Sequence, residues 1–129
     1  MASAGDATAA LAIGGYSTTV VAIVEQWDGT SWTEGNNLNT ARFSLAGAGT
    51  QTAGLVFGGN PSLKNETEEY DGTSWSEQNN LNTARNRAAA SGTSSSAAMF
   101  AGYTGTAFSV ATEEWSGAGA ILTRTFTLS

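Results

Sequence analysis

The chain repeats itself at an interval of 43 residues, and this repetition limits the possible architectures more than any other feature. Residues 27–42 and residues 70–85 are identical at 13 of 16 positions. Both segments begin with an aromatic residue and Asp-Gly-Thr-Ser-Trp, and both end in Asn-Asn-Leu-Asn-Thr-Ala-Arg. Repetition at an interval of roughly 20–50 residues is typical of proteins built from stacked supersecondary units. The sequence therefore predicts a stack of similar units.

A third, more diverged copy of the unit completes the chain. Short apolar runs that close with glycine recur at 11–15, 55–59 and 98–102. Pairs of polar residues followed by an aromatic residue recur at 25–27, 68–70 and 113–115. We therefore expect one repeat domain, 1–129, whose units cover about 1–41, 42–84 and 85–129.

Each unit is expected to form four short strands, which are named a to d in chain order. Strand b is the apolar run before the glycine pair, because a short run bounded by turn residues is typical of a buried strand. Asp-Gly-Thr-Ser favours a hairpin turn between strands c and d, since Asp and Gly adopt positive φ readily. Strand a is expected at 43–49 and 86–91, and strand c at 22–27, 66–70 and 110–115. No segment has helical periodicity with caps, so almost no helix is expected.

The tail, 121–129, alternates roughly between apolar and polar residues and lacks the Asn-Asn-Leu-Asn pattern. We interpret it as a terminating strand that either replaces strand d in the last unit or latches the assembled protein.

Four short strands in a repeat of this length are the signature of a β-propeller blade, so we expect an all-β propeller with three antiparallel blades per chain. A glycine pair that closes strand b, an aromatic residue at the end of strand c and a Trp in strand d together resemble the kelch repeat. The residues that carry the resemblance are Gly14-Gly15 with Trp27 and Trp32, and Gly58-Gly59 with Tyr70 and Trp75. The third unit has Ala101-Gly102 and Trp115 but no second Trp.

The turn between the aromatic residue and the Trp is shorter than in most kelch units, so the chain looks like a short-turn relative of that family. The alternative is the Trp-Asp repeat family, which Trp27-Asp28 suggests. The Gly-His signature of that family is impossible here, because the chain contains no histidine.

Charged and aromatic residues that recur once per unit are expected to hold neighbouring blades together. The glutamates are Glu25, Glu68 and Glu113, and the arginines are Arg42, Arg85 and Arg124. We expect buried inter-blade Glu–Arg pairs in which each charge needs the other. The aromatic wedges are expected to be Trp27, Trp32, Tyr70, Trp75 and Trp115. A carboxylate ring that binds a cation and a catalytic arginine cluster are the functional alternatives for these charges.

Three blades leave two blade faces uncovered, whereas propellers close with roughly four to eight blades. Large exposed apolar faces are usually interaction sites, and closed two-fold symmetry is the commonest oligomeric form. We therefore expect a homodimer that forms one six-bladed ring. The alternatives are a fragment, or a half that pairs with a similar partner chain.

Composition excludes several kinds of chemistry. Without cysteine or histidine, the chain cannot form disulfides, a Ser-His-Asp triad or a histidine-bound zinc or copper site. A net charge of −6 disfavours nucleic acid as a partner, and the sequence has no apolar run long enough to span a membrane. We expect no metal and no cofactor, and nothing in the composition indicates a compartment.

The loops between strands b and c differ between units, whereas the d-to-a connections are near copies. Because loops on a rigid scaffold often carry function, we expect a non-enzymatic binding module that presents its b–c loops to a protein or a glycan. The candidate ligand-binding residues are Tyr16, Thr18, Asn60, Lys64, Tyr103 and Phe108. The alternatives are a viral or engineered structural propeller without a ligand and a carboxylate-dependent glycoside hydrolase.

Overall fold

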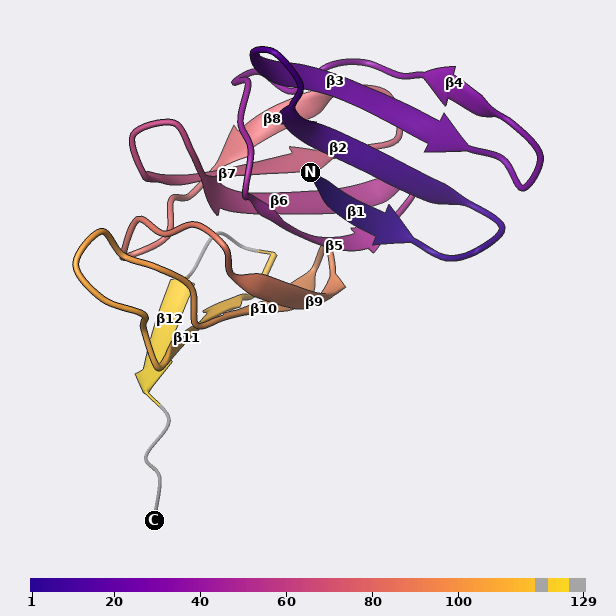
Figure 1. Ribbon diagram of the computed structural model, residues 1–129. Helices are drawn as coiled ribbons and strands as arrows, with labels where there is room; N and C mark the ends of the chain where they lie inside the picture. The colour runs from indigo at the N-terminus through magenta and orange to yellow at the C-terminus, as the bar shows by residue number, and fades with distance from the viewer. Residues whose placement is uncertain (118–120, 126–129) are drawn as a thin grey trace.

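The computed structural model describes residues 1–117 and 121–125, and in this part of the chain all regular secondary structure is β-strand. Consecutive strands form three four-stranded antiparallel sheets (Figure 1). The first sheet contains β1 (Ala2–Gly5), β2 (Ala10–Tyr16), β3 (Val20–Trp27) and β4 (Trp32–Glu34). The second contains β5 (Ala46–Thr50), β6 (Ala53–Gly59), β7 (Lys64–Tyr70) and β8 (Trp75–Gln78). The third contains β9 (Ala89–Thr93), β10 (Ser96–Phe100), β11 (Ala111–Trp115) and β12 (Ile121–Thr125).

The predicted four-stranded units and the absence of helix from the described residues are confirmed, but some predicted strand limits are wrong. Strand a begins three residues later than expected in the second and third sheets, at β5 and β9. The cause is Ser44 and Arg87, which both adopt a φ of 54°. An extended strand cannot continue through this left-handed conformation. Phe43 and Asn86 instead form isolated bridges.

Strand c also differs from the prediction, because β3 and β7 begin two residues earlier and β11 one residue later than expected. The tail prediction holds as far as the structure describes the tail, since β12 pairs with β11 as the fourth strand of the third sheet. Residues 126–129 lie outside the described part of the chain.

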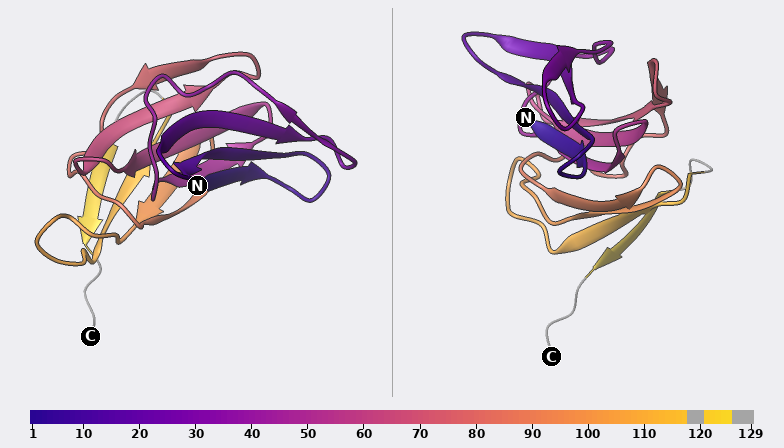
Figure 2. Two further views of the ribbon diagram at one scale, coloured as in Figure 1. Left: turned by 45° about the horizontal axis from the view of Figure 1, so that its top comes forward. Right: turned by 90° about the vertical axis from the view of Figure 1, so that its right-hand side faces the viewer.

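The three sheets lie on one another as layers, and the second sheet lies between the other two (Figure 2). The first strands of the sheets make the closest approach, with β5 in contact with both β1 and β9. Small residues are required at this approach. A Cβ atom added at Gly47 would lie 2.7 Å from the backbone oxygen of Ser3, so even alanine would collide there.

Two apolar clusters fill the spaces between the layers. The cluster between the first and second sheets contains Ala2, Ala4, Leu11, Ile13, Val24, Leu38, Leu45, Val56, Tyr70 and Trp75. The cluster between the second and third sheets contains Ala46, Ala48, Leu55, Phe57, Leu81, Ala97, Met99 and Trp115. Each fully buried Leu or Phe in such a cluster contributes roughly 1.5–3 kcal/mol of hydrophobic free energy. The layers are therefore held together mainly by side chains from facing sheets.

The repeated Asp-Gly-Thr-Ser segments form the turns between β3 and β4 and between β7 and β8. In the second turn, the Oδ1 atom of Asp71 accepts hydrogen bonds from the backbone N–H groups of Thr73 and Ser74, at 2.8 and 2.7 Å. Only the glycine of each turn has a positive φ, which is 94° in both. The expectation that Asp also needs positive φ is therefore wrong, and Asp stabilises the turn through its carboxylate.

Candidate functional site

The connecting segments 36–42 and 79–85, which have the same sequence, join each sheet to the next one. Their backbones stay with the preceding sheet. The N–H of Leu38 donates to the carbonyl of Ala22 at 2.9 Å, and the N–H of Leu81 donates to that of Asn65 at 2.7 Å. Their polar side chains reach the following sheet. Each connecting segment thus fastens two layers together.

The first connecting segment ends in an arginine that is buried in the second sheet. The Nη2 atom of Arg42 lies 2.7 Å from the Oε2 atom of Glu68, and neither side chain is exposed to solvent. Its Nη1 atom donates to the carbonyls of Gly58 and Glu66, at 3.1 and 2.9 Å. The backbone N–H of Asn39 donates to the other oxygen of Glu68, at 2.7 Å. A buried ion pair is tolerated when its remaining hydrogen-bonding groups are satisfied in this way.

The third sheet repeats this arrangement with Arg85. Its Nη2 atom lies 2.7 Å from the Oε2 atom of Glu113, and its Nη1 atom donates to the carbonyls of Ala101 and Ala111, at 2.6 and 3.2 Å. The N–H of Asn82 donates to Glu113 at 2.6 Å. We call each such set of one carboxylate and two backbone carbonyls an arginine site. The recurrence of the charged residues predicted the Glu–Arg pairs. Nothing in the sequence indicated that each arginine would also donate to two backbone carbonyls.

The first sheet has a counterpart of these sites, but no connecting segment within residues 1–117 and 121–125 lies over it. Glu25 is the counterpart of Glu68, and it pairs across the sheet with Ala12 as Glu68 does with Val56. The Glu25 side chain is exposed, and the described residues provide no ion pair for it. An open groove there is lined by Met1, Ala12, Gly14, Gly15, Tyr16, Ser17, Val21, Ile23 and Glu25. The predicted arginine partner of Glu25 is thus not found among the described residues, and the side chain of Arg124 lies outside them.

The predicted aromatic wedges also differ between the first sheet and the other two sheets. Tyr70, Trp75 and Trp115 are buried between sheets, and the rings of Tyr70 and Trp75 stack with centroids 4.9 Å apart. Trp27 is only half-buried, and 50% of Trp32 is exposed. These two side chains belong to the first sheet, which has a neighbouring sheet on one side only. Within one chain, Trp27 and Trp32 therefore do not wedge between two sheets as predicted.

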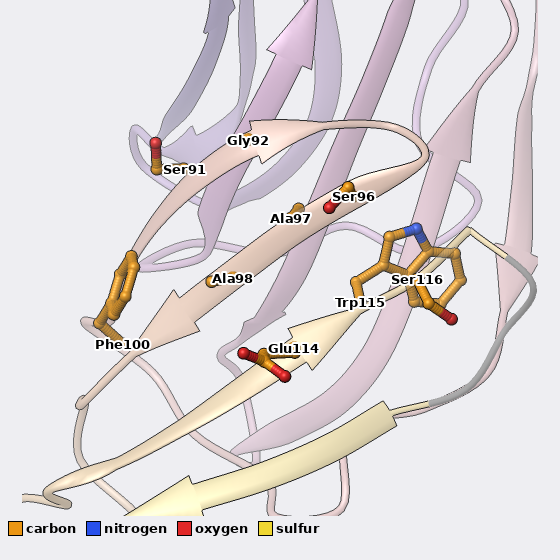
Figure 3. A pocket seen from close by; sticks show the side chains of 9 residues that line it. All are labelled: Ser91, Gly92, Ser96, Ala97, Ala98, Phe100, Glu114, Trp115 and Ser116. Carbon is orange, nitrogen blue, oxygen red and sulfur yellow. The ribbon is translucent and has the colours of Figure 1, made fainter. Parts of the chain in front are cut away.

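The outer face of the third sheet is the second uncovered face. It forms an open groove of about 500 Å³ whose lining includes Ala98, Phe100 and Glu114 (Figure 3). Trp115 also borders the groove, but its ring is buried and packs against Phe57 of the second sheet. Phe100 is half-exposed here, whereas its counterparts Ile13 and Phe57 are buried against the following sheet.

The b–c loops comprise residues 17–19, 60–63 and 101–110. They bring two of the three aromatic candidates together, whereas Tyr16 packs elsewhere. Tyr103 packs on Phe108 with ring centroids 5.4 Å apart, and Tyr16 packs on Phe43 of the second repeat at 5.5 Å. Tyr16 and Phe108 remain 65% and 72% exposed. Thr18 is also exposed.

The two remaining loop candidates take part in local structure. The backbone N–H and C=O of Asn60 both bond to Phe43, and its Oδ1 atom accepts from the N–H of Leu63 at 3.3 Å. The Nζ atom of Lys64 lies 3.7 Å from Glu66. Burial alone would raise the pKa of Glu66, but a backbone hydrogen bond and the charges of Lys64 and Arg42 lower it on balance. Asn60 and Lys64 therefore shape the second loop.

Within residues 1–117 and 121–125, no group of three or more acidic side chains is arranged to hold a metal ion. The same residues include no helix with the length and apolar character needed to cross a membrane. No protein-family model matches the sequence, and a comparison with curated proteins also finds no match.

Proposed function

We propose that this protein is a non-enzymatic scaffold of the β-propeller type, related in plan to kelch repeats, that presents its b–c loops to a binding partner. Each four-stranded sheet serves as one blade. The layered stacking of three sheets around their first strands supports this proposal, as does the repeated Gly, aromatic and Trp pattern.

The ring closes through a second copy of the chain, which gives six blades. The observation that carries this proposal is the contrast between covered and uncovered faces. Leu55 and Phe57 of the second sheet are buried against the third, whereas their counterparts Ala98 and Phe100 line an open groove. Tyr70 and Trp75 lie on the face of the second sheet that packs against the first sheet. The corresponding face of the first sheet is the uncovered one. The uncovered face of the first sheet in one copy can therefore pack on the uncovered face of the third sheet in the other copy. Two such contacts close the ring.

The proposed ligand surface lies on the b–c side of the ring. Exposed aromatic side chains that project from a rigid scaffold suit the apolar faces of sugars and peptide side chains. Tyr16, Thr18, Tyr103 and Phe108 are the contact residues in this proposal, and the ligand is a glycan or a protein.

Solution mass tests the ring. Light scattering behind a sizing column is expected to give twice the chain mass of 13.1 kDa. Phe100→Asp places a charge on the outer face of the third sheet and is expected to give the monomer mass. Phe108→Asp, which changes an exposed loop residue, is the control and is expected to leave the dimer intact. A wild-type mass of 13.1 kDa overturns the closed ring.

Ligand screening tests the binding module. We expect a glycan array or a peptide panel to give a signal that falls with Tyr16→Ala and Phe108→Ala. A panel without any signal favours a structural propeller without a ligand. Hydrolase activity that depends on a carboxylate would overturn the non-enzymatic assignment.

A further inference from the structure

The first sheet has a counterpart for each group that holds an arginine in the other two sheets, yet no connecting segment in the described part of the chain covers it. We propose that this uncovered arginine site binds an arginine side chain on an extended Asn-Asn-Leu-Asn-Thr-Ala-Arg-like segment of another polypeptide. The site consists of the Glu25 carboxylate and the backbone carbonyls of Gly14 and Ile23.

The correspondence between the sites is residue by residue. Gly14 is the counterpart of Gly58 in the glycine pair that closes strand b. Ile23 precedes Glu25 by two positions, as Glu66 precedes Glu68. All three residues line the same open groove of the first sheet. The strand register is also the same, since Gly15 pairs with Val21 as Gly59 pairs with Lys64. We therefore infer that the groove offers two carbonyl acceptors and one carboxylate in the pattern that holds Arg42.

The remainder of the segment also has its partners in the first sheet. In the second sheet, Asn39 donates through Nδ2 to the carbonyl of Trp75 at 2.9 Å, and the Trp75 indole N–H donates to Asn36 at 3.1 Å. The Nδ2 atom of Asn36 donates to the carbonyl of Thr73. In the first sheet, Trp32 corresponds to Trp75 and Thr30 corresponds to Thr73, and both lie in an identical Asp-Gly-Thr-Ser-Trp segment. Half of the Trp32 side chain is exposed.

Charge favours a cation at this position. Glu25 keeps its hydration because none of the described residues covers it, whereas Glu68 and Glu113 are buried only together with an arginine. Arginine fits better than lysine, because its planar group can donate to the carboxylate and the two carbonyls at once. The chain carries a net charge of −6, which also attracts a basic segment.

The proposed occupant is a segment other than residues 36–42 and 79–85. The printed sequence contains Asn-Asn-Leu-Asn-Thr-Ala-Arg twice, and both copies already occupy arginine sites inside the chain. This inference rests on the equivalence of the three sheets and not on ring closure, so it goes beyond the proposed function.

A synthetic peptide that copies residues 35–43, with blocked ends, tests the site. It is titrated into the ¹⁵N-labelled full chain, and binding is followed through the amide signals of residues 23–25 and the indole signal of Trp32. We expect saturable shifts confined to the first sheet. The same peptide with Arg42→Met is expected to bind at least about tenfold more weakly, because it lacks the charge-assisted hydrogen bonds.

Protein variants provide the matched comparison. Glu25→Gln is expected to weaken peptide binding by about tenfold or more. Glu77→Gln removes an exposed glutamate of β8 and is expected to leave binding unchanged. Equal binding of the arginine and methionine peptides, shifts outside the first sheet, or no binding of the arginine peptide to a monomeric sample would overturn the proposal.

Sedimentation of the same samples separates this inference from the proposed ring. A dimer that does not bind the peptide leaves the ring standing, because the second copy covers the first sheet there. The monomeric Phe100→Asp variant is then titrated, and its failure to bind the peptide overturns the arginine site. A monomer that binds the peptide overturns the ring and supports the arginine site.

Discussion

Arg85 and Glu113 are almost completely removed from solvent, and neither side chain can keep its charge in that position without the other. Arg85→Met removes one charge and leaves Glu113 buried without its partner. We expect the free energy of unfolding to fall by about 3–5 kcal/mol, measured by urea denaturation. Arg87→Met is the control, because Arg87 is exposed and its replacement is expected to cost no more than about 0.5 kcal/mol. Equal stability of the wild type and Arg85→Met would contradict a mutual dependence of the pair.

The exposed turn aspartates, Asp28 and Asp71, affect stability through their titration. Backbone hydrogen bonds from Ser74 and Thr73 lower the pKa of Asp71 below its ordinary value of 3.8, and those from Ser31 and Thr30 lower the pKa of Asp28. The native state therefore binds these protons less readily than the unfolded chain does. Their stabilising contribution is fully present above about pH 4 and is lost as the pH falls through the native pKa values.

Carbon-detected NMR titration is expected to place the midpoints of both side chains below 3.8. Asp71→Ala is expected to make stability less dependent on pH in this acidic range. A midpoint at or above 3.8 for either carboxylate would contradict the role assigned to the turn hydrogen bonds.

At the scale of the secondary-structure elements, the glycine that closes strand b fixes how a sheet meets the next connecting segment. Gly58 has a φ of 60°, and a Cβ atom there would lie 2.3 Å from the backbone oxygen of Arg85. Gly58→Ala is therefore expected to destabilise the protein by more than about 1 kcal/mol in urea denaturation. Gly35→Ala is the control, because the three atoms nearest to the added Cβ atom all belong to the side chain of Gln26, which can shift more easily than backbone. A larger loss for Gly35→Ala than for Gly58→Ala would contradict this difference.

The elements were predictable from the sequence to the extent that a local pattern determines them. The apolar run before each glycine pair and the Asp-Gly-Thr-Ser turn identify β2, β6 and the turns after β3 and β7, because both patterns act over a few neighbouring residues. The start of β5 was not predictable, since it depends on the left-handed conformation of Ser44, a residue that ordinarily tolerates extended backbone.

The arginine sites could likewise be predicted from the sequence only in part. The recurrence of Glu68, Glu113, Arg42 and Arg85 predicted charged pairs between layers. The carbonyls of Gly58 and Glu66 leave no trace in the sequence, because any residue type supplies a backbone carbonyl. The exposure of Glu25 was also missed, because its surroundings depend on which sheet faces which.

At the scale of the whole molecule, stability is shared unequally among the three sheets. In a stack of repeats, each unit is stabilised by its own strands and by the interfaces with its neighbours. Among the residues that the structure describes, the second sheet has an interface on both faces, whereas the first and third sheets have one each. A second copy that closes the ring would supply the two missing interfaces.

Hydrogen exchange measured at several protein concentrations tests this distribution. At low concentration, where the proposed dimer dissociates, the amides of β6 and β7 are expected to exchange most slowly, because opening the second sheet breaks two interfaces. Raising the concentration is expected to slow exchange in β3 and β11 much more than in β6 and β7, since association covers only the outer faces. Phe100→Asp serves as the control and is expected to remove the concentration dependence. Exchange rates that are independent of concentration in the wild type would contradict closure by a second copy, whereas faster exchange in β6 than in β3 at low concentration would contradict the unequal sharing of stability within one chain.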